Sequence, residues 1–405
     1  APIGLHLLQR SPPMSQTRSR PMILTAREIM EKLVAFPTVS RDPNLDLVDW
    51  VEDYLASHGV PARRVYDATG KKAALYANVG PEVAGGIVLS GHTDVVPVDG
   101  QDWTMDPFAV TEKDGRYYGR GTCDMKGFDA LALAMVPYAL SRGITRPLQI
   151  ALSYDEEVGC IGAPPMIDDM LTHLPRAAAA IIGEPSMLRP VTGHNASSIT
   201  DVHIHGYEVH SSKLPQGVSA IHEAGRVLGW VNDLNDKLMA ETPDPVSAMF
   251  DPPHTTAHVG LIAGGTAHNI TARDCTFKLG FRVPAGDDLE RHEAALSAFL
   301  TKLNATLRTR HPDAGVTWKR NPGVPALKPE TDGVAEALIR SLTGDNGTHV
   351  VTYGTEAGQF QERGYSAVVC GPGDIAQAHQ PDEWIDKAQF HAGEDLLKRV
   401  IDTLI

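Results

Sequence analysis

The feature that most constrains the fold is a repeated pattern, in which a short apolar run is followed by a small cluster containing Asp, Glu or His. The runs have the length and composition of buried strands. They are 87–89, 117–118, 148–152, 177–182 and 367–370, and the clusters that follow them are 90–94, 119–124, 155–157, 183–185 and 378–380. In an open α/β sheet, ligands bind in the crevice beyond the carboxyl ends of the strands. We therefore expect the five clusters to meet in one crevice.

The order of the predicted elements indicates two kinds of structure. From residue 26 to about 190, helices and strands alternate, which predicts a mostly parallel sheet covered by helices on both faces. Near residue 195 the pattern changes, and residues 275–283 alternate strictly between apolar and polar, as in a sheet with one buried face. We also expect a strand over 199–209 that shifts phase at Gly206, helices from 221 and 287, and a strand over 316–319. The predicted elements of this region therefore follow the order βαββαβ. That order is typical of a ferredoxin-like sandwich.

The chain is long enough to divide into two domains, since 405 residues exceed what one hydrophobic core usually supports. The α/β pattern resumes at 333–342, and the last cluster lies beyond it. We therefore predict a discontinuous α/β domain of residues 23–194 plus 324–405, into which residues 195–323 are inserted. Residues 1–22 carry prolines that oppose a helix, and we expect a disordered tail there.

Composition narrows the class of protein. The net charge of −14 argues against nucleic-acid binding, because no basic stripe is present to neutralise phosphates. No apolar stretch approaches the ~20 residues needed to span a bilayer. The four cysteines, Cys123, Cys160, Cys275 and Cys370, form no close pair, which favours buried thiols and a cytoplasmic protein.

The clusters contain the donors of a hydrolytic metal centre, although each residue alone has a simpler explanation. His92 can be a buried histidine beside a capping Asp94, and Asp124 can be the N-cap of the following helix. Glu156 and Glu157 are adjacent carboxylates that repel each other unless a cation lies nearby. Two imidazoles and several carboxylates in one crevice would suit a pair of metal ions.

Several longer motifs resemble the M20 metallopeptidase family and, within it, the acetylornithine deacetylases. The similarity extends over about residues 24–405, and the motifs are 90–97, 119–127, 156–159, 183–186, 353–358, 370–373 and 378–383. The resemblance implies a catalytic domain with two divalent ions, Zn²⁺ or alternatively Co²⁺. It places His92 and Glu184 on one ion, Glu157 and His379 on the other, Asp124 between them, Glu156 as general base and acid, and Asp94 as the group that orients His92.

The resemblance also implies that the inserted residues 195–323 form a lid domain that makes the protein a homodimer. His210 would stabilise the oxyanion, often in the neighbouring subunit's site. The implied substrate contacts are Asn269, Arg282, Thr355 and Gly373, with Arg282 gripping a carboxylate. The alternative for Arg282 is a solvated surface arginine.

The expected reaction is hydrolysis of the amide bond of an N-acyl-L-amino acid. N2-acetyl-L-ornithine is the favoured substrate, giving L-ornithine and acetate in arginine biosynthesis. Departures from the family pattern at Val209, at 194–196 and at 271–272 leave the substrate open. The alternatives are a succinyl-diaminopimelate desuccinylase, an aminoacylase, a dipeptidase, or a non-catalytic binding protein on the same scaffold.

One further histidine pair stands apart from these motifs. His203 and His205 can share one face of a strand, but the sequence shows no evident acidic partner for them. We expect both imidazoles on the surface of the lid.

Overall fold

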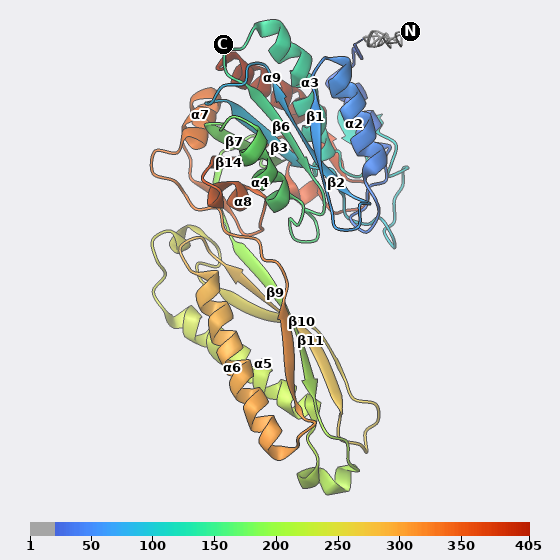
Figure 1. Ribbon diagram of the computed structural model, residues 1–405, viewed down its shortest axis with the longest axis vertical. Helices are drawn as coiled ribbons and strands as arrows, with labels where there is room; N and C mark the ends of the chain where they lie inside the picture. The colour runs from blue at the N-terminus through green and yellow to red at the C-terminus, as the bar shows by residue number, and fades with distance from the viewer. Residues whose placement is uncertain (1–20) are drawn as a thin grey trace, which may run out of the picture.

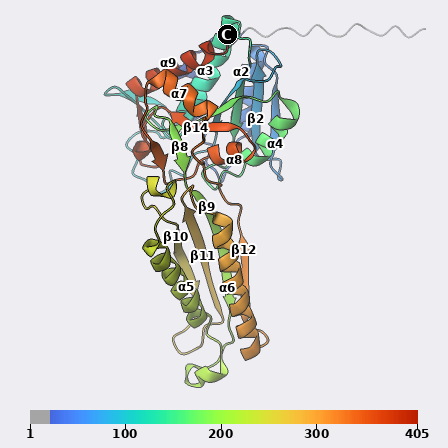
Figure 2. The same ribbon diagram turned by 90° about the vertical axis from the view of Figure 1, so that its left-hand side faces the viewer.

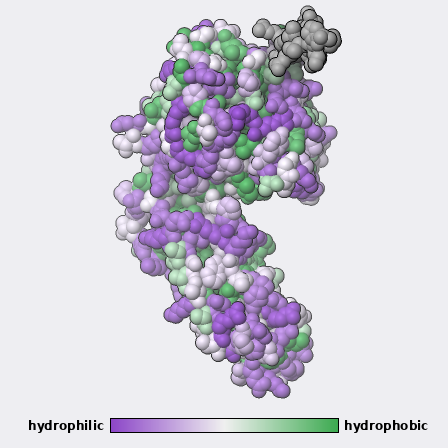
Figure 3. Space-filling model, viewed as in Figure 1, coloured by the Kyte–Doolittle hydropathy of each residue, from purple (hydrophilic) through white to green (hydrophobic). Residues whose placement is uncertain are grey.

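The computed structural model describes residues 21–405, which form two bodies joined end to end (Figure 1). The predicted tail, residues 1–22, lies outside the described residues except for its last two. The space-filling surface narrows between the two bodies and leaves an open notch on one side (Figure 3). Among residues 21–405, no helix is both long and apolar enough to cross a membrane.

The upper body contains an eight-stranded sheet with a parallel centre. Its strands run in the order β1 (Ala62–Tyr66), β2 (Ala73–Val79), β6 (Leu148–Ser153), β3 (Ile87–His92), β7 (Ala179–Pro185), β14 (Ser366–Gly371), β8 (Val191–His194) and β13 (His349–Val351). β6, β3, β7 and β14 are parallel neighbours, whereas β1, β2 and β8 add antiparallel pairs. The expected α/β class is confirmed, and the sheet is mixed, with a parallel centre.

Helices cover both faces of this sheet and make two cores. On one face pack α1 (Ala26–Val34), α2 (Leu45–Ser57), α3 (Lys126–Arg142), α7 (Val334–Thr343) and α9 (Lys387–Asp402). On the other face pack α4 (Ala163–His173) and α8 (Ala357–Glu362). β3, β6 and β7 are buried along their whole length, which explains their unbroken apolar sequences. Thr25 and Glu28 form the capping box that starts α1.

One predicted strand belongs elsewhere. The run 117–118 lies in β5 (Arg116–Tyr118), which pairs with β4 (Thr111–Lys113) and β15 (Trp384–Asp386) in a separate three-stranded sheet. Four of the five apolar runs therefore belong to the main sheet, and the run 117–118 does not. A run of two tyrosines is too short to distinguish a central strand from a hairpin.

The lower body is a four-stranded antiparallel sheet with two long helices on one face (Figure 2). Its elements follow the order β9 (Ala196–His205), α5 (Ala220–Ala240), β10 (Thr256–Gly264), β11 (Asp274–Val283), α6 (Leu289–Arg310) and β12 (Gly315–Arg320). The strands lie in the order β10-β11-β9-β12. The alternation in β11 buries Cys275, Phe277, Leu279, Phe281 and Val283 against the helices and leaves the other face open.

The strand predicted over 199–209 ends earlier, at His205. Gly206 explains this end, because a Cβ there would lie 2.2 Å from the carbonyl oxygen of Val218 and 2.5 Å from that of Ala272. Only glycine allows so close an approach of three backbone segments. The phase shift in the sequence thus marks the end of the strand.

Candidate metal centre

Three adjacent central strands deliver four of the candidate residues to one edge of the main sheet. His92 is the last residue of β3, Glu156 and Glu157 follow β6, and Glu184 lies near the end of β7. These strands are parallel neighbours, so their carboxyl ends lie side by side.

The other two candidates reach the same place by different routes. Asp124 lies in the loop between β5 and α3, and His379 follows the short 3-10 helix η3 (Ile375–Gln377) instead of ending β14. The five clusters therefore converge, although only three of them extend strands of the main sheet.

The imidazoles and carboxylates form two linked groups. His92 Nε2 lies 3.1 Å from Asp124 Oδ1 and 3.5 Å from Glu184 Oε1. His379 Nε2 lies 3.1 Å from Asp124 Oδ2 and 3.1 Å from Glu157 Oε2. The two oxygens of Asp124 thus face different imidazoles, and the nearest glutamate is Glu184 for His92 and Glu157 for His379.

Glu156 lies beside these groups. Its Oε2 is 3.9 Å from His92 Nε2, and its Oε1 is 3.3 Å from the thiol of Cys160, which donates to it. Burial, followed by the nearby carboxylate of Glu184, raises the pKa of Glu156 well above the ordinary glutamate value.

The electrostatics indicate a site built for positive charge. Burial and the Asp124 carboxylate raise the pKa of both Glu157 and Glu184 to about 7. Hydrogen bonds to Asp124 and Glu157 raise the pKa of His379 to about 10. Glu157 Oε1 and Glu184 Oε1 are buried without a hydrogen-bond partner among the described residues. Because buried carboxylate oxygens are costly when unpaired, these residues fit divalent cations.

Asp94 lies beside His92 and is closer to it through its backbone than through its carboxylate. Nδ1 of His92 lies 2.9 Å from the backbone carbonyl oxygen of Asp94 but 3.5 Å from its carboxylate. The carboxylate instead accepts the backbone N–H groups of Glu156 and Glu157, at 3.1 and 3.3 Å, and the hydroxyl of Ser40 at 2.6 Å. The backbone of Asp94 thus orients His92, and its side chain anchors the turn that carries both glutamates.

Two buried residues support the centre, and no role was assigned to them from the sequence. Glu383 Oε1 accepts the backbone N–H groups of Gly121, Cys123 and Asp124 at 3.0–3.1 Å. Its Oε2 pairs with Arg120 at 2.7 Å, and both side chains are almost fully buried. Arg120 lies in the motif 119–127 and Glu383 in the motif 378–383. The sequence alone does not show that these two motifs are in contact.

A cleft of about 510 Å³ joins the centre to the lower body. It is lined by Glu156 and Glu157 on one side and by Arg282, from the end of β11, on the other. Gly354 and Tyr353 also line it, whereas Thr355 is fully buried and accepts the N–H of Ala357 at 3.1 Å. Gly373 packs against Cys123, where a Cβ would lie 2.8 Å from its sulfur.

His210 and Asn269 lie away from this cleft. They belong to the segments that follow β9 and join β10 to β11, and the carbonyl oxygen of Asn269 accepts the N–H of Ser211 at 2.8 Å. β9 begins beside the upper body and runs downward for ten residues, about 30 Å, to these segments at the bottom of Figure 1. The structure therefore does not bring either residue to the metal centre of its own chain.

The histidine pair of β9 has an acidic partner after all. His203 Nε2 lies 2.9 Å from Asp274 Oδ1, across the antiparallel pairing of β9 with β11. The partner was missed because the two strands are separated by a helix and another strand in the sequence.

Comparison with known proteins agrees with this geometry. Residues 88–403 match the family described as peptidase family M20/M25/M40. The chain belongs to this family. Its members are metal-dependent hydrolases, and the candidate ligand groups for such ions near the centre are His92 with Asp124 and Glu157, and His92 with Glu156 and Glu184.

Individual relatives are similar along nearly the whole chain. An acetylornithine deacetylase from Myxococcus xanthus is 36% identical over 387 residues, which cover 93% of this chain and 96% of the relative. A metallo-carboxypeptidase from Sulfolobus solfataricus has a TM-score of 0.75 at 16% identity, covering 94% of this chain and 99% of the other. A tripeptidase from Staphylococcus aureus has a TM-score of 0.72 at 18% identity, covering 94% and 97%. At these identities the two solved structures show a shared fold.

Proposed function

We propose that this M20 family protein removes the acyl group from an N-acyl-L-amino acid, with N2-acetyl-L-ornithine as the favoured substrate. The products would be acetate and L-ornithine, as a step of arginine biosynthesis. The observation that carries the reaction type is Asp124, whose two oxygens face two separate imidazole–glutamate groups. The similarity to the Myxococcus xanthus acetylornithine deacetylase supports the choice of substrate.

Two divalent ions would be held by the residues already described. His92 and Glu184 would hold one, Glu157 and His379 the other, and Asp124 would touch both. Imidazole and carboxylate donors favour Zn²⁺, with Co²⁺ as the alternative. Such ions supply Lewis-acid polarisation of the scissile carbonyl and make water more acidic.

Glu156 is the proposed proton carrier. It lines the cleft, and its Oε2 lies 3.9 Å from His92 Nε2, farther than the nearest oxygens of Asp124 and Glu184 at 3.1 and 3.5 Å, so we assign its carboxylate to proton transfer. Its raised pKa makes its carboxylate a stronger base than an ordinary glutamate, which suits a group that must accept a proton. It would take a proton from the attacking water and deliver it to the departing amine.

Arg282 is the proposed anchor for the substrate's α-carboxylate. It lies on the open face of β11, in the same cleft as Glu156 and Glu157. A guanidinium can pair with a carboxylate through two parallel hydrogen bonds, which would fix the amide between the two bodies of the chain. Closure of the lower body onto the substrate would bring the Arg282 guanidinium closer to Glu156 and Glu157.

We further propose a homodimer that forms through the lower body and brings His210 to the partner's cleft. Within the described chain, β10 pairs only with β11, which leaves its other edge open. Leu261 and Ile262 on this edge are 67% and 51% exposed, and the strand has no lysine or proline to block pairing. The position of His210 far from its own centre supports action across the interface.

A cytoplasmic location is also proposed. All four cysteines are buried and free, as expected in a reducing compartment.

The decisive assay measures free-amine release from N-acetyl-L-ornithine beside N-succinyl-diaminopimelate, N-acetyl-methionine and a dipeptide, with Zn²⁺ or Co²⁺ supplied. Preference for acetylornithine is the expected result. Preference for another substrate would keep the chemistry and overturn the choice of substrate.

The role of Glu156 is tested in the same assay. Glu156→Gln should lower turnover by about 10²- to 10⁴-fold and leave the metal content unchanged. Glu82→Gln removes an exposed carboxylate from a loop outside the centre and should have no effect. Unchanged turnover in Glu156→Gln would exclude Glu156 as the base, and inactivity of the wild-type protein on every substrate would favour a binding protein.

A further inference from the structure

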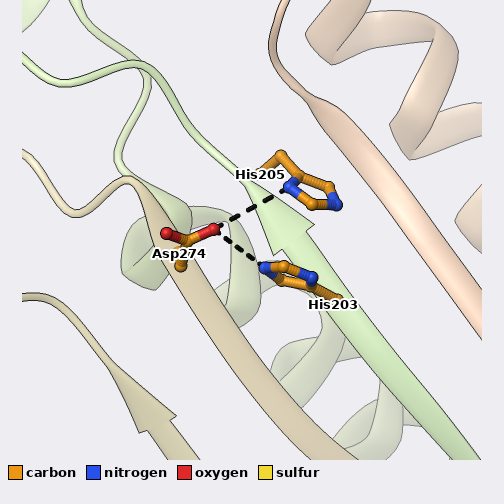
Figure 4. A group of neighbouring side chains, drawn as sticks. All are labelled: His203, His205 and Asp274. Atoms are coloured by element: carbon orange, nitrogen blue, oxygen red, sulfur yellow. Dashed lines mark hydrogen bonds and ion pairs between the residues drawn. The ribbon is translucent and has the colours of Figure 1, made fainter.

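A cluster of metal-binding side chains lies outside the proposed active site, on the open face of the lower sheet. His203 and His205 extend from β9, and Asp274 is the first residue of the neighbouring strand β11. Figure 4 shows both rings turned toward the same carboxylate. We propose that His203, His205 and Asp274 bind a further divalent transition-metal ion of the Zn²⁺ type.

The distances place the three donors around one point. Asp274 Oδ1 lies 2.9 Å from His203 Nε2 and 3.8 Å from His205 Nδ1, and the two ring centroids are 3.8 Å apart. All three donor atoms fall within 4.8 Å of one another. Donors around a tetrahedral Zn²⁺ with bonds of 2.0–2.1 Å are separated by about 3.3 Å. The cluster therefore needs only small side-chain movements to enclose an ion.

The backbone fixes this arrangement. His205 and Asp274 are directly paired in the β9–β11 ladder, and His203 lies two residues along on the same face. Side chains at directly opposed positions of antiparallel strands are close neighbours. The donors are thus held by paired strands and not by a loop.

Two further contacts resemble those around known metal ligands. Nε2 of His205, the nitrogen that faces away from Asp274, lies 3.4 Å from Thr317 Oγ1 on β12. Histidines that bind metals usually donate their second ring N–H to such a partner, which selects the tautomer. Arg273 donates to Asp274 Oδ2 at 2.9 Å, which leaves Oδ1 directed at both rings.

The donor types select the class of ion. Two imidazoles and one carboxylate favour Zn²⁺, Cu²⁺ or Ni²⁺ over Ca²⁺ and Mg²⁺, which prefer oxygen. The side chains are 36–44% exposed, so ions can enter from solvent and water can complete the coordination. This site is separate from the proposed active site, which lies at the edge of the main sheet in the upper body.

The proposed ion would lie at the end of the β9–β11 ladder. Asp274 and His205 form the last pair of the β9–β11 ladder, beyond which the chain leaves the sheet at Gly206. The segments beyond carry His210 and Asn269. An ion at this position would cross-link β9 and β11 where these two strands meet the segments that carry His210 and Asn269.

The test measures binding of additional Zn²⁺ by the metal-loaded protein. Holoenzyme with its active-site ions in place is titrated calorimetrically with Zn²⁺, and the bound metal per chain is counted after dialysis. We expect the wild-type chain to bind one more ion than His203→Ala or Asp274→Asn. Loss of an outer partner of a metal ligand already costs about 10- to 100-fold in affinity, so loss of a ligand should raise Kd at least about 10-fold.

The matched control is His391→Ala, which removes one exposed imidazole from α9 and leaves the cluster intact. It should bind the additional ion as the wild type does. Asp274→Asn keeps the shape of the side chain, which separates loss of a ligand from misfolding. Absence of an additional ion in the wild-type protein would overturn the proposal, and so would an additional ion that persists in both cluster variants. Because the readout is ion binding, the result is independent of the substrate that the active site hydrolyses.

Discussion

A single buried carboxylate, Glu383, holds the loop that carries Asp124. It accepts three backbone N–H groups of that loop and pairs with Arg120, which is itself buried. Glu383→Gln removes the charge and leaves the guanidinium without its counter-ion. We expect a loss of about 3–5 kcal/mol in the free energy of unfolding, measured by urea denaturation of the metal-free protein.

The same variant should also weaken metal binding by about 10- to 100-fold, because the loop that positions Asp124 is no longer fixed. Glu112→Gln is the matched control, since Glu112 forms ion pairs with Lys387 and Arg27 at the surface. Screening by solvent makes such pairs weak, and both stability and metal binding should stay unchanged. Equal effects of the two variants would show that Glu383 does not hold the loop that carries Asp124.

In the proposed metal centre, protons and metal ions would compete for the carboxylates of Glu157 and Glu184. Burial raises the pKa of Glu157 and Glu184 from 4.5 to about 7. The protonated forms therefore stabilise the metal-free fold at low pH, and that contribution is lost as the pH rises from about 4.5 to about 7. Ions held by these two carboxylates would have to displace the protons, so metal affinity should rise over the same range.

The expected result is a larger increase in Tm on adding Zn²⁺ at pH 8 than at pH 6. Thermal unfolding of the metal-free and Zn²⁺-loaded protein at both pH values measures it. An increase that is equal at both values, or larger at pH 6, would mean that these carboxyls are not the groups that bind the ions.

At the scale of elements, the centre depends on close packing of β7 against α3. Gly183 precedes Glu184, and a Cβ at Gly183 would lie 2.0 Å from ring atoms of Phe128 in α3. Gly183→Ala should push the two elements apart, with a loss of about 1–3 kcal/mol in unfolding free energy. The shift should also weaken metal binding, because Glu184 and Asp124 adjoin these elements. Urea denaturation and metal titration measure both effects.

A glycine-to-alanine substitution at Gly225 is the control, because there is room for a Cβ at this position. Gly225 lies in α5, where a Cβ would meet no atom within 4 Å. Gly225→Ala should stabilise the protein by about 0.5–1 kcal/mol through the lower entropy of the unfolded chain. If Gly183→Ala were as benign as Gly225→Ala, the packing argument for β7 and α3 would be wrong.

The elements also show how far sequence reasoning extends. Strands β3, β6 and β7 were predictable because strands buried on both faces have unbroken apolar sequences, and their ends carry His92, Glu156, Glu157 and Glu184. The sheet to which β5 belongs and the contact partner of Asp274 were not predictable from the sequence. Pairing between distant strands depends on topology, and neither the separate β5 sheet nor the contact of Asp274 with His203 has a local signal.

At the scale of the whole molecule, the two bodies separate His210 from the metal centre of its own chain. If the open edge of β10 pairs with a second copy, His210 can complete the partner's site. Mixtures of His210→Ala and Glu156→Ala chains then regain activity, because each heterodimer contains one site with both residues intact. With random exchange in a two-fold dimer, roughly a quarter of wild-type activity is expected. The measurement is amine release after the two inactive variants are mixed and exchange is verified by mass. No recovery in verified heterodimers would mean that His210 acts within its own chain or takes no part, whereas a chain that remains monomeric would exclude the dimer itself.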